Sequence, residues 1–427
     1  MNPTAIEAHA KLVLVQWMII IAAAWLFGRL ARRIGQPLAV GEILAGILLG
    51  PSALGSVWPA DWPVLFPLET QQSLQLLGKI GLILLLFQVG MEFDYGHLRS
   101  RSKTVMMVSV LGIVAPFLCA LAIGPWLHRE FAPDLPRFGF QLFLCIALSI
   151  SALPIMGRIL LEMKLERTVI GAMGVSAAAI DDVVGWILLA MATTMVTSGF
   201  NGWDVVVQTT GVLAFFALLH FGIGPLIRKI WRSPFGRGEN GGMTPSFLAF
   251  LLVVLFGCCL VTNKLGVFAI FGAFLFGVSL HQERELVKAW RERFSEFVIV
   301  ALVPIFFTNT GLNTSIGSLN TPVAWIACLL VLTAAVAGKF GGCFIGARLT
   351  GETPRNAACI AALMNTRALM ALVAINIGLD LKLLNRELFT MLVIMALITT
   401  AMTEPLLRLF LPAESRRGSD CKPDKTL

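Results

Sequence analysis

Charged residues are scarce in this sequence, and long polar segments are scarcer still. Only 14% of the 427 residues are Asp, Glu, Lys or Arg, whereas soluble domains contain roughly a quarter. Hydrophobic residues make up 57% of the chain. They collect in runs of about 20, the length at which a helix crosses the hydrocarbon of a bilayer. This composition excludes a soluble globular domain and predicts a protein that crosses the membrane many times, in contact with lipid.

Sequence motifs of catalysis and of metal binding are missing as well. The chain contains no GxSxG, HExxH or P-loop motif, and no GxGxxG within a βαβ unit. Its eight cysteines form no CxxC pair and no cysteine–histidine cluster with metal-site spacing. We therefore expect no enzyme activity and no cofactor. The net charge of +8 does not indicate a nucleic acid partner, because the basic residues lie in short loops between apolar runs.

Thirteen apolar segments follow one another with short loops between them. They lie near residues 12–30, 38–53, 74–92, 104–127, 138–160, 167–197, 204–230, 244–262, 265–281, 295–312, 321–349, 354–378 and 387–411. No loop is long enough to hold a soluble domain. We interpret residues 1–411 as one integral membrane domain and residues 412–427 as a short, polar cytoplasmic tail.

The distribution of Lys and Arg predicts the orientation of the chain. If the N-terminus lies outside and the segments alternate, the inside loops and tail hold 24 Lys and Arg, and the outside segments hold six. Cytoplasmic loops of membrane proteins carry such an excess of positive charge. We therefore expect a multi-pass protein of the cell inner membrane with a periplasmic N-terminus and a cytoplasmic C-terminus.

A short internal repeat links the second and ninth segments. Residues 45–52 (AGILLGPS) resemble residues 272–279 (GAFLFGVS), and the segment after each copy ends in a similar phrase, LFQVGMEFD at 86–94 and FFTNTGLNT at 306–314. The copies are seven segments apart, so they cross the membrane in opposite directions. Inverted repeats are typical of transporters, whose substrate sites lie near the membrane midplane. Close packing of glycine-rich helix faces is the alternative explanation.

Two adjacent acids interrupt the middle of the sixth segment. Asp181 and Asp182 lie within GVSAAAIDDVVGWILLA, and a charged side chain at that depth costs about 2.5–3.5 kcal/mol. Neighbouring helical residues point about 100° apart, so one carboxylate can face an ion while the other faces a partner group. Carboxylates suit hard cations, and a carboxyl group in apolar surroundings favours its protonated form. The pair is therefore a candidate site for a proton and a metal cation, Na⁺ or K⁺; a structural ion pair is the alternative.

A lysine lies equally deep in the eleventh segment. Lys339 is surrounded by small residues in AAVAGKFGGCFIGARL, which allow a neighbouring helix to approach closely. The lysine is too far from the segment ends to reach water easily, and an aspartate is its natural partner. Such a pair could open when the aspartate binds a cation, with release of a proton from the lysine. A purely structural pair stays open as the alternative.

Two segments contain helix-breaking residues at membrane depth. Ser151 and Pro154 lie near the middle of the fifth segment, and proline removes a helical hydrogen bond. Asn365, Thr366 and Arg367 lie near the middle of the twelfth. Broken helices are tolerated in membranes only where the freed backbone is buried or lines a cavity. We expect these two to cross, with Arg367 neutralising negative helix ends; a simple proline kink, with Arg367 paired elsewhere, is the alternative.

Several motifs together resemble the monovalent cation:proton antiporter-2 family, especially its plant cation/proton exchanger branch and bacterial relatives. In chain order they are VGEILAGILLGPSALG (40–55), FQVGMEFD (87–94), LSISALPIMGRIL (148–160), AAAIDDVVGWILLA (177–190) and NTRALMALVAINIGLDL (365–381). The resemblance implies an all-α membrane protein with about thirteen transmembrane helices in an inverted repeat, including two broken crossing helices. It also implies a homodimer, with Asp182 as the main ion ligand and Lys339 as the partner of Asp181.

The same resemblance divides the chain into two domains. A dimerisation scaffold would lie near residues 12–92 and 244–312, and a core near 104–197 and 321–411 would move against it, with the segment near 204–230 as a link. The family phrase NTRGLMEL differs here, because Ala368 replaces its glycine and Ala371 its glutamate, and Ser151 stands where threonine is common. We interpret the chain as a secondary antiporter that exchanges Na⁺ or K⁺ for protons by alternating access.

Three other functions fit parts of the pattern. A cation channel or uniporter of the same fold would transport without coupling to protons. A membrane aspartyl protease needs two acids that face each other, usually from different helices, whereas these acids are adjacent in one. An organic-anion transporter is disfavoured because Asp181 and Asp182 would repel an anion.

Overall fold

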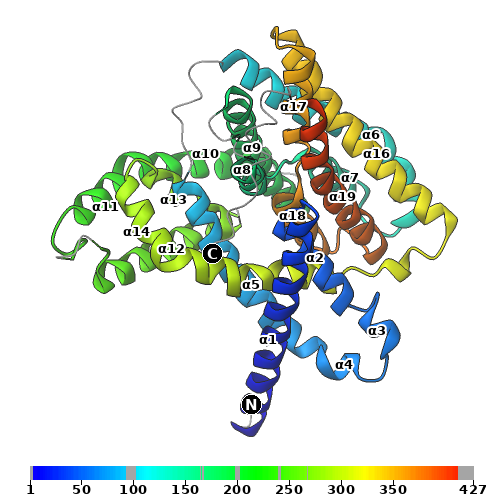
Figure 1. Cartoon of the computed structure of the whole chain (residues 1–427), viewed down its shortest axis with the longest axis horizontal. Coiled ribbons are helices and arrows are strands. Elements are labelled where there is room, and N and C mark those ends of the chain that lie inside the picture. The colour runs from blue at the N-terminus through cyan, green and yellow to red at the C-terminus, as the bar shows by residue number, and fades with distance from the viewer. Residues whose placement is uncertain are drawn as a thin grey trace. The chain divides into compact units, whose positions relative to one another are not determined.

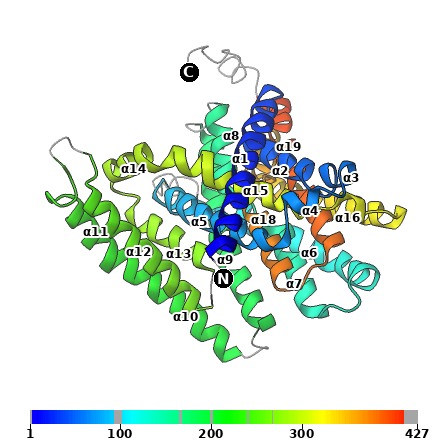
Figure 2. The ribbon, with the colours of Figure 1, turned by 90° about the horizontal axis from the view of Figure 1, so that it is seen from below.

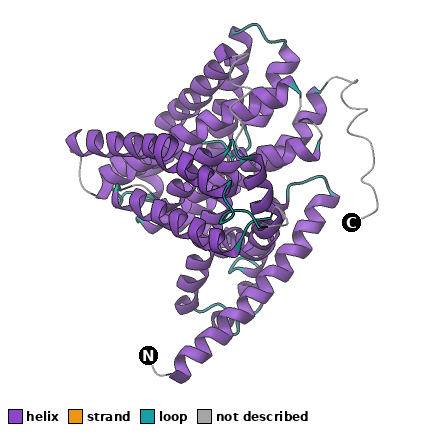
Figure 3. Cartoon of the chain, turned by 90° about the vertical axis from the view of Figure 1, so that its left-hand side faces the viewer, coloured by secondary structure: helices purple, strands orange, loops and turns teal. Residues whose placement is uncertain are grey.

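The computed structural model describes residues 3–92, 102–163, 165, 168–197, 202–238, 242–266 and 268–411. Within these ranges the secondary structure is helical, and the β-structure is limited to one isolated bridge between Arg237 and Met243 (Figure 3). The predicted cytoplasmic tail at residues 412–427 lies outside the described residues.

Each of the thirteen predicted segments corresponds to one helix or to consecutive helices (Figure 1). The helices are α1 (Pro3–Arg33), α2 (Leu38–Leu49), α3 (Leu54–Val57), α4 (Trp62–Leu65), α5 (Leu68–Met91), α6 (Ser102–Phe131), α7 (Arg137–Ser149), α8 (Leu153–Glu162), α9 (Val169–Thr197), α10 (Gly202–Leu218), η2 (Leu219–Ile223), α11 (Gly224–Trp231), α12 (Pro245–Lys264), α13 (Ala269–Leu280), α14 (Arg284–Trp290), η3 (Arg291–Ser295), η4 (Val298–Leu302), α15 (Val303–Leu312), η5 (Ile316–Ser318), α16 (Pro322–Leu349), α17 (Pro354–Met364), α18 (Ala368–Asp380) and α19 (Arg386–Phe410). Eleven helical stretches of the described part are long and apolar enough to cross a membrane. Two shorter apolar helices, Arg137–Ser149 and Ala269–Leu280, correspond to the other predicted segments. The predicted all-α fold class is confirmed, and the helix count is roughly consistent with thirteen segments.

The two copies of the internal repeat lie on helices of equal length. Helices α2 and α13 have 12 residues each. Counted from the helix starts, Gly41 corresponds to Gly272 and Gly46 to Gly277. This register differs by four residues, about one helical turn, from the match of the sequence phrases. In this register two pairs of glycines coincide, whereas the sequence phrases pair only Gly50 with Gly277.

The chain divides into two compact units. Unit 1 comprises Met1–Trp25, Leu54–Asp94 and Ala190–Gly311, and unit 2 comprises Leu26–Ala53, Tyr95–Leu189 and Leu312–Leu427. In unit 1, α13 packs against α5, α11 and α12. Helices α11, α12 and α13 run side by side in Figure 2. Helices α5 and α13 approach each other closely at Gly90, because a Cβ atom added there would lie 2.9 Å from the backbone N of Val278 on α13.

Within unit 2, α6 and α16 run side by side (Figure 1). Gly338, Gly342 and Gly346 recur every four residues on the face of α16 that meets α6. A Cβ atom at Gly338 would lie 2.5 Å from the Cα of Pro116, and one at Gly346 would lie 2.8 Å from the carbonyl oxygen of Met107. The small residues around Lys339 therefore allow the close approach of α6, which becomes one wall of the site described next.

Candidate functional site

Two broken helices cross in the interior of unit 2. Residues 150–152 separate α7 from α8, and residues 365–367 separate α17 from α18. The backbone N–H of Ala152 donates a hydrogen bond to the carbonyl oxygen of Thr366 at 2.8 Å. The freed backbone of one break therefore pairs with that of the other, as buried backbone must when no water can reach it.

Pro154 lies just after the first break rather than in it. It is the second residue of α8, where a backbone N–H would have no partner within the helix. The fixed φ of proline is also compatible with the first turn of a helix. The segment therefore breaks before its proline, at residues 150–152, and not at the proline itself.

Arg367 lies at the carboxyl end of α7. Its side chain is completely buried, and Nη1 donates a hydrogen bond to the carbonyl oxygen of Leu148. Nη2 donates to the carbonyl oxygen of Ala335 on α16 at 2.7 Å. The last carbonyl groups of a helix have no partner in that helix and carry partial negative charge. The guanidinium group supplies both the positive charge and the donors that these carbonyls need.

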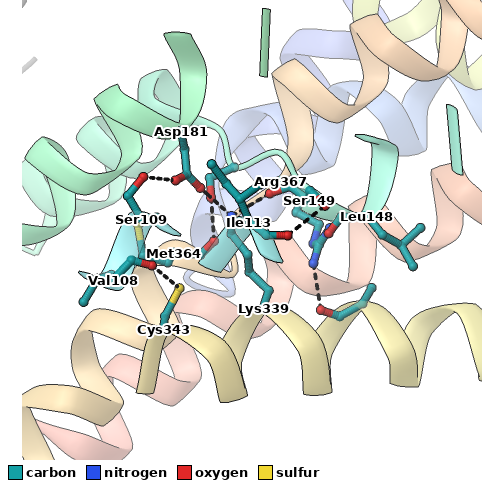
Figure 4. A network of polar contacts seen from close by, with 12 residues as sticks. Val108, Ser109, Ile113, Leu148, Ser149, Asp181, Lys339, Cys343, Met364 and Arg367 are labelled. Atoms are coloured by element: carbon teal, nitrogen blue, oxygen red, sulfur yellow. Dashed lines mark hydrogen bonds and ion pairs between the residues drawn. The ribbon is translucent and has the colours of Figure 1, made fainter. Parts of the chain in front are cut away.

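Asp181 is held by three side chains from three other parts of unit 2 (Figure 4). Nζ of Lys339 donates to Oδ2 of Asp181, and Oγ of Ser151 lies 3.0 Å from the same oxygen. Oγ of Ser109 donates to Oδ1 at 2.7 Å. Lys339 also donates to the carbonyl oxygen of Ser149 at 2.6 Å. Each of these five residues is at most 1% exposed, so the ion pair is buried and surrounded by hydrogen-bond partners.

Asp182, in contrast to Asp181, has a carboxyl oxygen that accepts no hydrogen bond in the described part of the chain. The backbone N–H of Leu153, at the start of α8, donates to its carboxyl group. Within the described ranges, Oδ1 of Asp182 has no hydrogen-bond partner, nor has either side-chain amide atom of Asn365. Asp182 is 1% exposed and Asn365 0%, and an unsatisfied buried polar group costs about 1–3 kcal/mol. These oxygens, both beside the crossing, are the ligand type that hard cations select.

The sequence analysis did not identify several hydroxyl groups that line this region. Ser109 of α6 touches Asp181 directly. On α19, Oγ1 of Thr400 accepts a hydrogen bond from the backbone N–H of Ala368, the first residue of α18. The hydroxyl group of Thr403 lies 2.9 Å from that of Thr366. The clustering of threonines in ITTAMTEP was the available signal, since polar residues rarely gather in a membrane helix without a partner.

Comparison with known proteins places the chain in a family. The model of the transmembrane sodium/hydrogen exchanger family matches residues 18–409. The chain belongs to this family. The Na(+)/H(+) antiporter NhaS4 of Synechocystis is 35% identical over 414 residues, which cover 94% of this exchanger and 98% of the relative. Cation/H(+) antiporter 20 of Arabidopsis thaliana is 34% identical over 417 residues, and the exchanger spans 49% of its length.

The fold of the exchanger matches a solved structure. The sodium proton antiporter MjNhaP1 of Methanocaldococcus jannaschii superimposes with a TM-score of 0.70 over 96% of the exchanger and 100% of that chain, at 13% identity. Likeness at this identity concerns the fold alone. Together, the family match and the fold confirm the resemblance inferred from the sequence motifs and identify a multi-pass membrane transporter.

Proposed function

We propose that the exchanger is a secondary antiporter that trades Na⁺ or K⁺ for protons, with Asp182 as the group for which cation and proton compete. The observation that carries this proposal is the contrast between two adjacent acids. Both oxygens of Asp181 are engaged by Lys339, Ser151 and Ser109, whereas Oδ1 of Asp182 has no partner in the described part of the chain. The names of the relatives, which include antiporters of sodium and of other cations, support the same class of transport.

The chemistry of the exchange follows from charge. A buried carboxylate can be neutralised either by a proton or by a bound alkali cation, and the two exclude each other on one oxygen. Asn365 offers a neutral amide oxygen that coordinates a cation but binds no proton at physiological pH. Lys339 balances the charge of Asp181 through their ion pair. A channel or uniporter would need no carboxylate for which a proton and a cation compete.

Alternating access assigns a role to each part of the chain. All the site residues lie in unit 2, so one body that contains them can carry the ions as a whole. In our proposal, residues near 104–197 and 321–411 form the moving core; unit 2 differs from this division in that it also includes Leu26–Ala53 and stops at Leu189. Residues near 12–92 and 244–312 form the scaffold and the contact of a homodimer. Inverted-repeat transporters commonly work by the motion of one bundle against another around a central site.

Proton flux in everted membrane vesicles tests the proposed function. Vesicles that contain the exchanger and hold an acid interior should lose their pH gradient when NaCl or KCl is added, and each alkali cation is tested in turn. Vesicles without the exchanger provide the baseline. Cation uptake that proceeds at the same rate with and without a pH gradient would identify a channel or uniporter instead.

We also propose that the exchanger lies in the cell inner membrane with its N-terminus in the periplasm and its C-terminus in the cytoplasm. The support is the excess of Lys and Arg in one set of loops, 24 against six. A reporter enzyme that is active only in the periplasm should stay silent when fused after Lys425 and should be active when fused before the first helix. The opposite pattern would overturn the orientation.

A further inference from the structure

We propose that Thr400 and Thr403 of α19 are positioning residues that hold the break between α17 and α18 in place and thereby set the affinity for the transported cation. This inference rests on the proposed exchange, in which Asn365 offers an amide oxygen to the cation beside Asp182. Both threonines are completely buried, and α19 packs against α17 and α18. They lie three residues apart, on one face of the helix.

Thr400 caps the start of α18 from a different helix. The first N–H groups of a helix have no partner within it, and the residue before the helix often supplies one. Arg367 precedes α18, but its side chain donates to carbonyl oxygens of α7 and α16 instead (Figure 4). Oγ1 of Thr400 accepts the hydrogen bond from the N–H of Ala368 at 3.0 Å. The hydrogen of Thr400 goes to the carbonyl oxygen of Ala396 at 2.7 Å, so a lone pair stays available for α18.

Thr403 contacts the break itself. Its hydroxyl group lies 2.9 Å from that of Thr366 and 3.2 Å from the carbonyl oxygen of Thr399 on its own helix. Both hydroxyl hydrogens have an acceptor when Thr366 donates to Thr403 and Thr403 donates to Thr399. The break is therefore joined to α19 at residue 366 as well as at residue 368.

The break between α7 and α8 holds the same stretch of backbone. The N–H of Ala152 donates to the carbonyl oxygen of Thr366 at 2.8 Å. The backbone from Thr366 to Ala368 thus has two sets of partners, the other break and α19. Asn365 directly precedes this stretch, and neither atom of its side-chain amide has a hydrogen-bond partner in the described part of the chain. The backbone, rather than a contact of the amide, therefore sets where the amide oxygen of Asn365 lies.

Loss of the hydroxyl group at position 400 has a defined consequence for cation binding. Thr400→Val keeps a β-branched side chain of nearly the same shape but leaves the N–H of Ala368 without its acceptor. A buried backbone donor needs a partner, so the start of α18 and the break before it shift. The amide oxygen of Asn365 moves with the backbone and coordinates the cation less well. We expect the half-saturating cation concentration to rise by about three- to tenfold.

The test measures proton exchange in proteoliposomes at fixed pH, over a range of concentrations of the cation that drives exchange in the unchanged protein. A variant that is only less stable has fewer active copies, which lowers the maximal rate but not the half-saturating concentration. Thr400→Val should raise the half-saturating concentration. Thr400→Ser, which keeps the hydroxyl group, should restore the value of the unchanged protein.

Thr399→Val is the matched control. Thr399 lies on the same helix and is completely buried as well. Its hydroxyl group donates to the carbonyl oxygens of Met395 and Ala396 within α19. The control makes the same chemical change one residue away, and its half-saturating concentration should equal that of the unchanged protein.

Each result supports or overturns the role of the threonines. A Thr400→Val variant with the half-saturating concentration of the unchanged protein would overturn it, whatever the maximal rate. An equal rise in Thr399→Val or Thr400→Ser would overturn it too, because both variants keep a hydroxyl group at position 400. Should Thr400→Val fail to insert, Thr403→Val carries the test, because it leaves the acceptor for Ala368 in place. A rise in Thr403→Val supports the role, and an unchanged value overturns it.

The proposed function is tested separately in the same experiment. Absence of cation-dependent exchange by the unchanged protein would overturn the proposed function itself, and this inference with it. Normal exchange by the unchanged protein together with an unaltered half-saturating concentration in Thr400→Val would overturn this inference alone.

Discussion

Asp182→Asn is expected to reduce cation-dependent proton exchange to the level of empty vesicles while the protein still inserts and folds. The amide has the size of the carboxyl group but carries no negative charge and cannot exchange a proton near neutral pH. Its oxygen can still accept the hydrogen bond from the backbone N–H of Leu153, which the carboxyl group accepts in the unchanged protein. The start of α8 therefore keeps its partner, and the loss concerns transport rather than folding.

The measurement is proton flux in vesicles with matched amounts of each variant. Asp380→Asn provides a control of the same chemistry, because Asp380 is exposed at the end of α18, outside the site. That variant should exchange ions as the unchanged protein does. Exchange at a normal rate by a well-inserted Asp182→Asn variant would remove Asp182 from the ion site.

Arg367→Met is expected to destabilise the fold. The substitution keeps a long apolar side chain but removes the donors to the carbonyl oxygens of Leu148 and Ala335. The carbonyl oxygen of Leu148, at the end of α7, is left without a donor, which costs about 1–3 kcal/mol, whereas that of Ala335 keeps its helical donor within α16. The negative end of α7 also loses its compensating charge, and we expect a total cost of about 2–4 kcal/mol.

Thermal unfolding in detergent, followed by the loss of monodisperse protein, measures this cost. The unfolding midpoint of Arg367→Met should fall by roughly 5 °C or more. Lys288→Met is the control, because the side chain of Lys288 is 77% exposed and pairs with that of Glu292, which is 65% exposed. Exposed pairs contribute about 0–1 kcal/mol, so its midpoint should change little. Equal midpoints for both variants would contradict the structural role of Arg367.

The charged residues of the site could be predicted from the sequence because each of them is costly at membrane depth. Asp181, Asp182, Lys339 and Arg367 stand out from apolar surroundings, and this cost implies partners in the interior. Hydroxyl groups do not have this high cost at membrane depth, so they do not stand out in the sequence. Ser109 could bond a carbonyl oxygen of its own helix, so the sequence gives no reason to place it in the site. The threonine cluster in ITTAMTEP indicates buried partners for Thr400 and Thr403 but does not indicate which partners. Only the arrangement of α6 and α19 brings these hydroxyl groups to the site.

Breaks and registers were less predictable than the helices themselves. Mean hydropathy treats α17 and α18 as one apolar segment, and the break at residues 365–367 was marked only by the polar residues Asn365, Thr366 and Arg367. Proline marked the broken fifth segment correctly but not the position of the break, because the first turn of a helix accepts proline. The helix starts and the sequence phrases give registers of the repeat that differ by one turn, since glycine-rich apolar helices match one another in several registers.

Competition between a proton and a cation for Asp182 can be measured directly on the purified exchanger. In weakly buffered detergent solution, addition of NaCl or KCl should release protons in proportion to cation binding, with at least about one proton per cation. The release should decline as the pH is lowered and should be absent from Asp182→Asn. Cation binding without proton release, or undiminished release from Asp182→Asn, would contradict exchange at this carboxylate.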